Sequence, residues 1–319
     1  MKLHKGIVTA AALLAAAAII SPATAEATTA SGVSAPRIAV HFDLAAGQQP
    51  ENIDLAPNGT AEVTFANARQ VAEVTPGGRI RVLATLPAPA DGGVNTPALH
   101  FPLTTGIVRD HDGTLYFLYA TGTADLTGVW RLRPGGTPRR IAALPADGLP
   151  NGMALEPHTR TLYIADSALG KIWQVPTTGG TPKTWSAAPE LAVNGFLGAN
   201  GLKIHNGAVW ATNLDQGTVL RIPFGHQGEA GKVETKATGL AGIDDFAFAG
   251  RGDTILAALD PSSTVALIRP DGTHSTVLSA ADGLRNPTSI AVRGNTVYVL
   301  SAAYLTAEDP NLLLAHLDR

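Results

Sequence analysis

Short apolar segments separated by polar turns repeat along the chain, and no stretch shows a sustained 3.6-residue apolar stripe. The clearest unit covers residues 151–176: it starts at Asn151-Gly152, turns at Pro157-His158 and contains three apolar segments. The next unit, residues 200–223, has the same order. Segments of this length, rich in β-branched and aromatic residues and bounded by Gly, Asn, Asp and Pro, predict β-strands.

The unit recurs with starts near residues 51, 105, 151, 200, 244 and 288, a spacing of 44 to 54 residues. This period suits a propeller blade of four short strands. A β-sandwich would not repeat its motif six times, and a solenoid would use shorter repeats. The sequence therefore predicts an all-β chain that forms a single six-bladed β-propeller, with four-stranded antiparallel blades around a central channel.

The ends of the repeat array predict how the ring closes. Residues 36–44 alternate like a strand before the first blade. An open ring would leave an unpaired strand edge, so we expect this segment to pair beside the C-terminal strand near Leu312 to Leu317. The propeller is expected to span residues 36–319.

The first 25 residues read as a secretory signal peptide. Lys2 and Lys5 precede an apolar run from Ile7 to Ile20, and residues 23–25 form a small-x-small cleavage site. About fourteen apolar residues are too few to span a bilayer. We expect a secreted, extracellular protein with no membrane association after cleavage. Residues 26–35 are small and polar and are expected to form a flexible lead-in.

The composition excludes some types of catalytic site and argues against some classes of partner. The chain has no cysteine, which excludes cysteine nucleophiles and thiolate metal sites. Its formal net charge is −3 and the sequence shows no basic cluster, which argues against nucleic acid or anionic lipid as partner. We expect a monomer that acts on a small molecule.

Polar residues open all six repeats. Because the first strand of each blade lines the channel, these residues should converge on one face although they are far apart in sequence. Oxygen donors alone are the ligand set of a hard cation such as calcium, and histidine is missing from the ring. Asn-Gly is also a turn signal, so each asparagine taken alone has a structural interpretation. The blade starts read Glu51, Thr104-Thr105, Asn151, Asn200, Asp244-Asp245 and Thr288-Ser289.

Four of these segments carry a family resemblance: residues 50–53, 150–154, 199–202 and 242–245. With them the chain resembles the calcium-dependent six-bladed propeller hydrolases of the senescence marker protein/gluconolactonase family, to which paraoxonase and diisopropyl fluorophosphatase are related. The resemblance implies one Ca²⁺ at the central channel, where another divalent cation could also bind. The implied ligands are Glu51, Asn151, Asn200 and Asp244, and Asp245 could add a further one.

Departures from the family pattern narrow the range of expected substrates. Thr105 stands where paraoxonase-like relatives place a catalytic histidine, and residues 102–106 replace the sugar-binding Arg-x-Asn-Asp-Gly segment. A sugar-acid lactone is therefore disfavoured. His100, just before the second blade, is a candidate acid or base. The expected substrate pocket consists of Thr104, Thr105, Phe101, Phe196, Phe246 and Ser289.

These observations favour calcium-dependent hydrolysis of a lactone or other ester. The cation would polarise the substrate carbonyl, and Asp244 or Asp245 would act as general base on water. No G-x-S-x-G segment is present, which disfavours Ser-His-Asp catalysis. Two alternatives remain open: a non-enzymatic binding or scaffold propeller with a structural cation, and a metal-assisted lyase or cyclase that stabilises an enolate.

Overall fold

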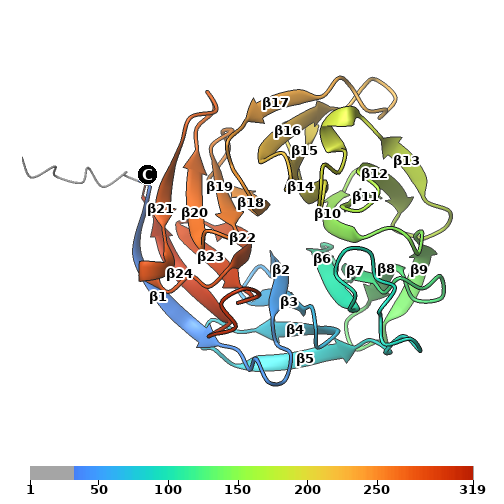
Figure 1. Cartoon of the computed structure of the whole chain (residues 1–319), viewed down its shortest axis with the longest axis horizontal. Helices are drawn as coiled ribbons and strands as arrows, with labels where there is room; N and C mark the ends of the chain where they lie inside the picture. The colour runs from blue at the N-terminus through green and yellow to red at the C-terminus, as the bar shows by residue number, and fades with distance from the viewer. Residues whose placement is uncertain (1–31, 319) are drawn as a thin grey trace, which may run out of the picture.

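Six four-stranded antiparallel sheets surround a central axis in the computed structural model, which describes residues 32–318 (Figure 1). The predicted six-bladed propeller is confirmed. The described residues contain no α-helix, only the two 3₁₀ turns η1 (Pro189–Leu191) and η2 (Ala280–Asp282). No helix within residues 32–318 has the length and apolar character needed to cross a bilayer. The expected signal peptide, residues 1–25, lies outside the described residues, so export stays a prediction.

The first three blades each use four consecutive strands, ordered from the axis outward. Their strands are β2 (Pro50–Leu55), β3 (Ala61–Phe65), β4 (Gln70–Val74) and β5 (Ile80–Thr85); β6 (Leu103–Arg109), β7 (Leu115–Ala120), β8 (Gly128–Leu132) and β9 (Arg139–Ala143); β10 (Pro150–Glu156), β11 (Thr161–Asp166), β12 (Lys171–Pro176) and β13 (Lys183–Ser186).

The fourth and fifth blades repeat this order, and the sixth has three consecutive strands. Their strands are β14 (Ala199–His205), β15 (Ala208–Asn213), β16 (Thr218–Pro223) and β17 (Glu234–Ala237); β18 (Ile243–Phe248), β19 (Ile255–Leu259), β20 (Thr264–Ile268) and β21 (His274–Leu278); β22 (Pro287–Arg293), β23 (Thr296–Ser301) and β24 (Asn311–Leu317). Each blade begins one or two residues before its predicted start.

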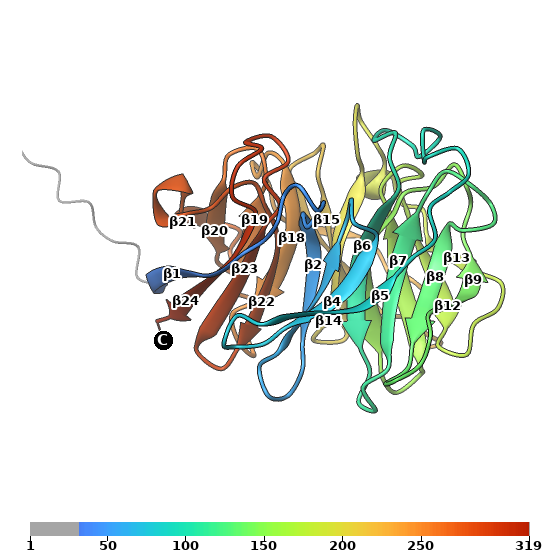
Figure 2. The same cartoon turned by 90° about the horizontal axis from the view of Figure 1, so that it is seen from below.

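The N-terminal strand β1 (Val33–His41) supplies the fourth strand of the sixth blade (Figure 2). It pairs antiparallel with β24, in a register that runs from Val33 opposite Leu317 to His41 opposite Asn311. The predicted closure is therefore confirmed. Residues 33–35, expected in the flexible lead-in, belong to this strand, because β24 extends far enough to pair with them.

Apolar side chains fill the spaces between neighbouring blades. Six buried clusters each join residues of two adjacent blades. Strand β7 shows why its sequence, LYFLYA, is apolar throughout: Phe117 and Tyr119 pack toward the first blade, whereas Tyr116 and Leu118 pack toward the third. Burial of both faces replaces the usual alternation of apolar and polar residues in a strand.

An irregularity in strand pairing recurs where each innermost strand begins. Register shifts occur in β2, β6, β10, β14, β18 and β22, within the first five residues of each. Such bulges change the direction of a side chain, and they are frequent beside functional sites. In this chain they fall on the polar residues that open the blades.

Glycines beside these bulges let the innermost strands approach one another. A Cβ added at Gly106 would lie 2.3 Å from the carbonyl oxygen of Asn151, and one at Gly152 would lie 2.2 Å from that of Asn200. Real Cβ atoms do not approach backbone atoms this closely. Close approach of backbones is one of the uses of glycine, so these positions exclude side chains.

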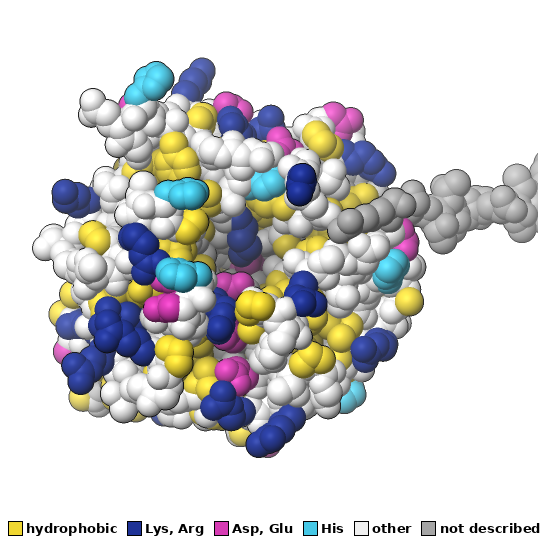
Figure 3. All heavy atoms as spheres, turned by 180° about the vertical axis from the view of Figure 1, so that it is seen from behind, with side chains coloured by type: hydrophobic (Ala, Val, Ile, Leu, Met, Phe, Trp, Pro, Cys, Tyr) yellow, Lys and Arg dark blue, Asp and Glu magenta, His cyan; other side chains and the backbone are white. Residues whose placement is uncertain are grey.

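A buried ion pair links two of the innermost strands, β14 and β18. Lys203 donates to both carboxylate oxygens of Asp245 at 2.7 Å, and Ser289 and Asn52 donate to Asp245 Oδ2 at 2.6 and 3.0 Å. Asp245 is 1 % exposed. On the face shown in Figure 3 the channel opens as a hollow of about 420 Å³, lined by residues of all six innermost strands. Lys203 is one of the residues that line this hollow.

Replacing Lys203 should destabilise the propeller. Lys203→Met leaves the buried Asp245 carboxylate without its counter-charge, which costs roughly 3–5 kcal/mol of unfolding free energy. Urea unfolding measures the loss, and Lys232→Met, at an exposed lysine, is the matched control. The double variant Lys203→Met/Asp245→Asn should recover part of the stability. A Lys203→Met protein as stable as the control would contradict the assignment.

Candidate functional site

The four expected cation ligands line one cavity at the other mouth of the channel. Its volume is about 440 Å³, and Glu51, Asn151, Asn200 and Asp244 all border it. Each comes from the bulged start of a different innermost strand, and each is between 1 % and 7 % exposed. The structure thus brings together residues that span almost 200 positions of sequence. Their role as cation ligands stays a prediction.

Hydrogen bonds fix the orientation of these side chains. The Tyr304 hydroxyl donates to Glu51 Oε2 at 2.6 Å, and Asn200 Nδ2 donates to Asp244 Oδ1 at 2.7 Å. Ser167 Oγ lies 2.8 Å from Asn200 Oδ1. The polar groups are therefore held in two separate hydrogen-bonded sets, Tyr304 with Glu51 and Ser167 with Asn200 and Asp244.

Burial shifts the ionisation of the cavity carboxyls, and no lysine or arginine of residues 32–318 lines the cavity. Burial raises the pKa of Glu51 to about 7, with Tyr304 opposing the rise and Asp260 adding repulsion. Burial, followed by repulsion from Glu51, raises the pKa of Asp244 well above its ordinary value. Burial also raises the pKa of Asp260 to about 6, with Asn286 opposing. Buried like charges are costly without a counter-ion, so the cavity favours binding of a cation.

Two residues that the sequence did not single out complete the polar part of the cavity. Asp260 follows β19, and Tyr304 lies in the connection between β23 and β24. Asp260 Oδ1 is buried and has no hydrogen-bond partner. In the sequence Asp260 precedes Pro261 and reads as a turn residue, so no local signal distinguishes it.

Asn286 fixes the two segments that carry these residues. Its side chain is buried, donates to the backbone oxygen of Asp260 at 3.1 Å and accepts from the backbone N–H groups of Leu305 and Thr306 at 2.9 Å. Asp260 and the segment after Tyr304 are therefore held by one side chain.

Apolar side chains form the rest of the cavity wall. They come from the long loops before β6 and β14, from Leu103 at the start of β6, from Leu214 after β15, and from the connections after β19 and β23. The apolar lining residues are Leu99, Phe101, Leu103, Phe196, Leu197, Leu214, Pro261 and Leu305. A largely apolar cavity with a few converging polar groups is the usual form of a small-molecule site.

Large exposed hydrophobic residues concentrate on the same loops. The described part of the chain has five, Val82, Val94, Val193, Phe196 and Leu305, and all except Val82 lie on these loops. Phe196 and Leu305 are 49 % and 70 % exposed and border the cavity itself. The apolar lining therefore continues from the cavity onto the surface around it.

The loop that carries Phe196 is held in place by polar side chains. The Asp215 carboxylate accepts hydrogen bonds from the backbone N–H groups of Asn194, Phe196 and Leu197. Asn213 donates to two backbone carbonyls of the same loop, both at 2.9 Å. The loop therefore has a defined conformation in which Phe196 faces the cavity.

Several expected site residues do not line the cavity. Asp245 points into the channel interior and pairs with Lys203. His100 is exposed, and its Nδ1 lies 3.0 Å from the backbone oxygen of Val94. The remaining four are fully buried, the hydroxyl groups in hydrogen bonds and the aromatic ring in an interblade cluster: Thr104, Thr105, Ser289 and Phe246. Of the expected pocket residues, Phe101 and Phe196 border the cavity.

The donor set at the cavity fits a hard cation through mixed ligands. Within residues 32–318 no group of three or more acidic or histidine side chains forms a metal cluster. The set instead combines the carboxylates of Glu51 and Asp244 with the amides of Asn151 and Asn200, which are oxygen donors of the type that Ca²⁺ takes. Rotation of the Asn200 amide would present its oxygen to the cavity, and Ser167 could then accept from its nitrogen.

Comparison with known proteins supports the fold. No protein-family model matches the chain, and no curated protein matches it in sequence. Among solved structures, the calcium-binding protein regucalcin from Agrobacterium tumefaciens is 16 % identical, with a TM-score of 0.66 over 89 % of this chain and 95 % of the other. A gluconolactonase-type protein is 15 % identical, with a TM-score of 0.61 over 89 % and 92 %.

A lyase also shares the fold. Virginiamycin B lyase from Staphylococcus aureus, in a catalytically inactive form with quinupristin, is 16 % identical, with a TM-score of 0.60 over 85 % of this chain and 81 % of the other. The TM-scores establish a common architecture. At identities this low they do not establish a common activity, which has to be argued from the residues of the cavity. The chain is a six-bladed β-propeller with distant structural similarity to regucalcin, gluconolactonase and virginiamycin B lyase.

Proposed function

We propose that this protein is an exported, calcium-dependent hydrolase of a lactone or other ester that has an apolar group. The observation that carries the proposal is the shared cavity of Glu51, Asn151, Asn200 and Asp244 beneath an apolar rim. The calcium-binding function of the regucalcin neighbour is consistent with it. When bound, a divalent cation would supply Lewis-acid polarisation of the ester carbonyl.

Each polar residue of the cavity has a role in this proposal. Glu51 and Asp244 hold the cation through their carboxylates, with Asn151 and Asn200 as neutral oxygen donors. Tyr304 orients Glu51 through its 2.6 Å hydrogen bond. Asp260 accepts a proton from the attacking water, because it lines the cavity and its Oδ1 has no hydrogen-bond partner. Asp245, paired with Lys203, takes no part in proton transfer.

The apolar wall determines the kind of ester. Leu99, Phe101, Leu214 and Leu305 offer no hydrogen-bond donors to sugar hydroxyl groups. They would contact an alkyl, acyl or aromatic part of the substrate and exclude bulk water from the reacting carbonyl. A buried polar substrate group without partners would lose binding free energy there, so sugar-acid lactones are disfavoured.

Substitutions at the cavity should separate cation binding from catalysis. Glu51→Gln and Asp244→Asn should abolish hydrolysis and also the increase in Tm that Ca²⁺ produces in the parent, because both remove a ligand. Asp260→Asn should lower kcat by about 10²–10⁴-fold and keep the Ca²⁺-dependent increase in Tm. The readouts are an ester and lactone hydrolysis panel and thermal unfolding with and without Ca²⁺.

Asp271→Asn, in the exposed turn before β21, is the matched control and should leave both readouts unchanged. Calcium stabilisation without any hydrolysis by the parent would favour a binding propeller with a structural cation. Release of an unsaturated product without uptake of water would favour a lyase, which the virginiamycin B lyase neighbour makes the second candidate. Unchanged hydrolysis in Glu51→Gln would contradict the proposed site.

Rim substitutions should affect substrate binding more than turnover. Phe196→Ala and Leu305→Ala remove apolar contact area beside the cavity, so KM for long-chain esters should rise about tenfold. KM for short-chain esters and kcat for both should change little. Val82→Ala, at an exposed valine outside the cavity, is the matched control. Equal effects on short and long esters would exclude an apolar binding role for the rim.

A further inference from the structure

The hairpin of β8 and β9 in the second blade gathers three arginine side chains. Arg131 of β8 is the direct cross-strand partner of Arg139 of β9, and Arg133 follows β8 in the connecting turn. All three border one surface cavity of about 310 Å³. No basic cluster is expected from the sequence. The pairing of β8 with β9 brings these arginines together and corrects that expectation.

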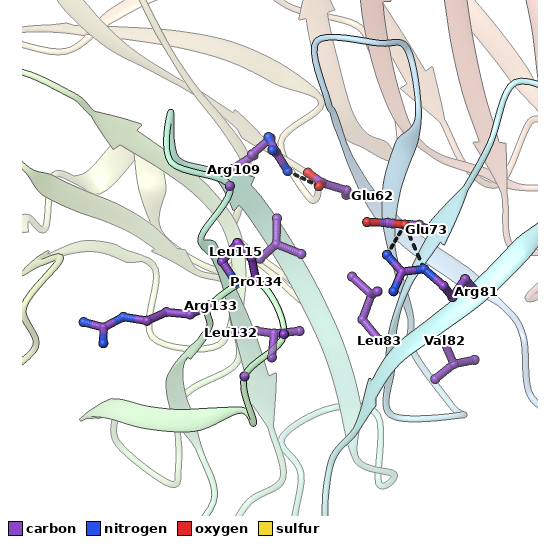
Figure 4. A pocket seen from close by; sticks show the side chains of 13 residues that line it. Glu62, Glu73, Arg81, Val82, Leu83, Arg109, Leu115, Leu132, Arg133 and Pro134 are labelled. Carbon is purple, nitrogen blue, oxygen red and sulfur yellow. Dashed lines mark hydrogen bonds and ion pairs between the residues drawn. The ribbon is translucent and has the colours of Figure 1, made fainter.

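Nearby carboxylates are already engaged by other arginines. On the other side of the turn, Glu62 pairs with Arg109, and Glu73 pairs with Arg81 at 2.6 Å (Figure 4). Figure 4 also shows Arg133 directed away from these pairs. Among the residues that the structure describes, no ion pair involves any arginine of the cavity.

This arrangement has an electrostatic cost that an anion would offset. Like charges directly opposite each other in a sheet are destabilising. The chain as a whole has a net charge of −3, so the positive charge is a local feature of this hairpin. Besides the three arginines, only Gly136 and Thr137 line the cavity, and neither is acidic or bulky.

The chemistry of the cavity fits a tetrahedral oxyanion. Guanidinium groups present planar forks that donate two hydrogen bonds to a phosphate or sulfate, and a threonine hydroxyl can add a further donor. We propose that Arg131, Arg133 and Arg139 form a binding site for the phosphate or sulfate group of a small ester. This site shares no lining residue with the cavity of the proposed hydrolase.

An adjoining cleft provides room for the organic part of that ester. Arg133 and Gly136 border both spaces, and the cleft has a volume of about 270 Å³. Its wall combines leucine side chains with hydrogen-bonding charged groups: Leu83, Leu115, Leu132, Glu62, Glu73, Arg81 and Arg109. Glu62 is 1 % exposed, and its Oε2 is buried without a hydrogen-bond partner. Such an acceptor favours a ligand with a hydroxyl group, because an unmet buried acceptor is costly.

Calorimetric titration with three soluble probes tests the site. Glucose 6-phosphate should bind, inorganic phosphate should bind at least tenfold more weakly, and glucose should not bind. Arg131→Gln and Arg139→Gln should each weaken glucose 6-phosphate binding about tenfold or more. Arg139→Lys should have an intermediate effect, since it keeps the charge and loses the fork. Arg251→Gln, at an exposed arginine of the fifth blade, is the matched control.

Two results would overturn the proposal. The first is the absence of glucose 6-phosphate binding at millimolar concentration, or binding that the arginine substitutions leave unchanged. The second is binding to phosphatidylglycerol vesicles with none to the soluble probes, which would identify a lipid surface as the source of the phosphate. Equal affinity for inorganic phosphate and glucose 6-phosphate would overturn the role of the cleft. Ester hydrolysis should be unchanged in these variants, so failure here is distinct from failure at the hydrolase cavity.

Discussion

The close approach of six innermost strands at the axis is the constraint on which the structure depends. Gly106 and Gly152 each face a backbone carbonyl of the next blade with no room for a side chain. The bulges beside them direct polar side chains into the channel. The propeller therefore concentrates buried acidic and amide groups around the channel. These groups can bind a ligand together, and the carboxyl groups among them repel one another when ionised.

The channel handles the resulting negative charge in two different ways. Deep in the channel, Lys203 neutralises Asp245, and Ser289 and Asn52 complete its hydrogen bonds. At the cavity, Glu51 and Asp244 have only neutral partners, and their pKa values are raised by burial. The acidic pair Asp244-Asp245 is thus divided between an internal ion pair and a cavity carboxyl that has only neutral partners. The register shift of β18 between Ile243 and Phe246 spans this pair, and a bulge changes the directions of the side chains that it contains.

Local sequence was informative where local forces decide the conformation. Asn206-Gly207 forms the hairpin turn between β14 and β15, with both residues at positive φ, as this dipeptide favours. The same dipeptide at Asn151 and Asn200 opens innermost strands instead, because packing against the next blade overrides the turn preference. Equivalent positions in a repeat made the convergence of these asparagines predictable. Asp260 and Tyr304 come from connections that differ between blades, so the repeat gave no sign of them.

The sequence by itself determined the repeat, and with it the number of blades, the closure by the N-terminal strand and the polar ring at the axis. These follow from periodicity and from the need to bury apolar faces and pair strand edges. Only the tertiary structure decided which polar groups face a common cavity. It also placed Asp245 with Lys203 and gathered Arg131 with Arg139. Such pairings depend on strand register and on contacts between blades, and neither can be deduced from the sequence of a single segment.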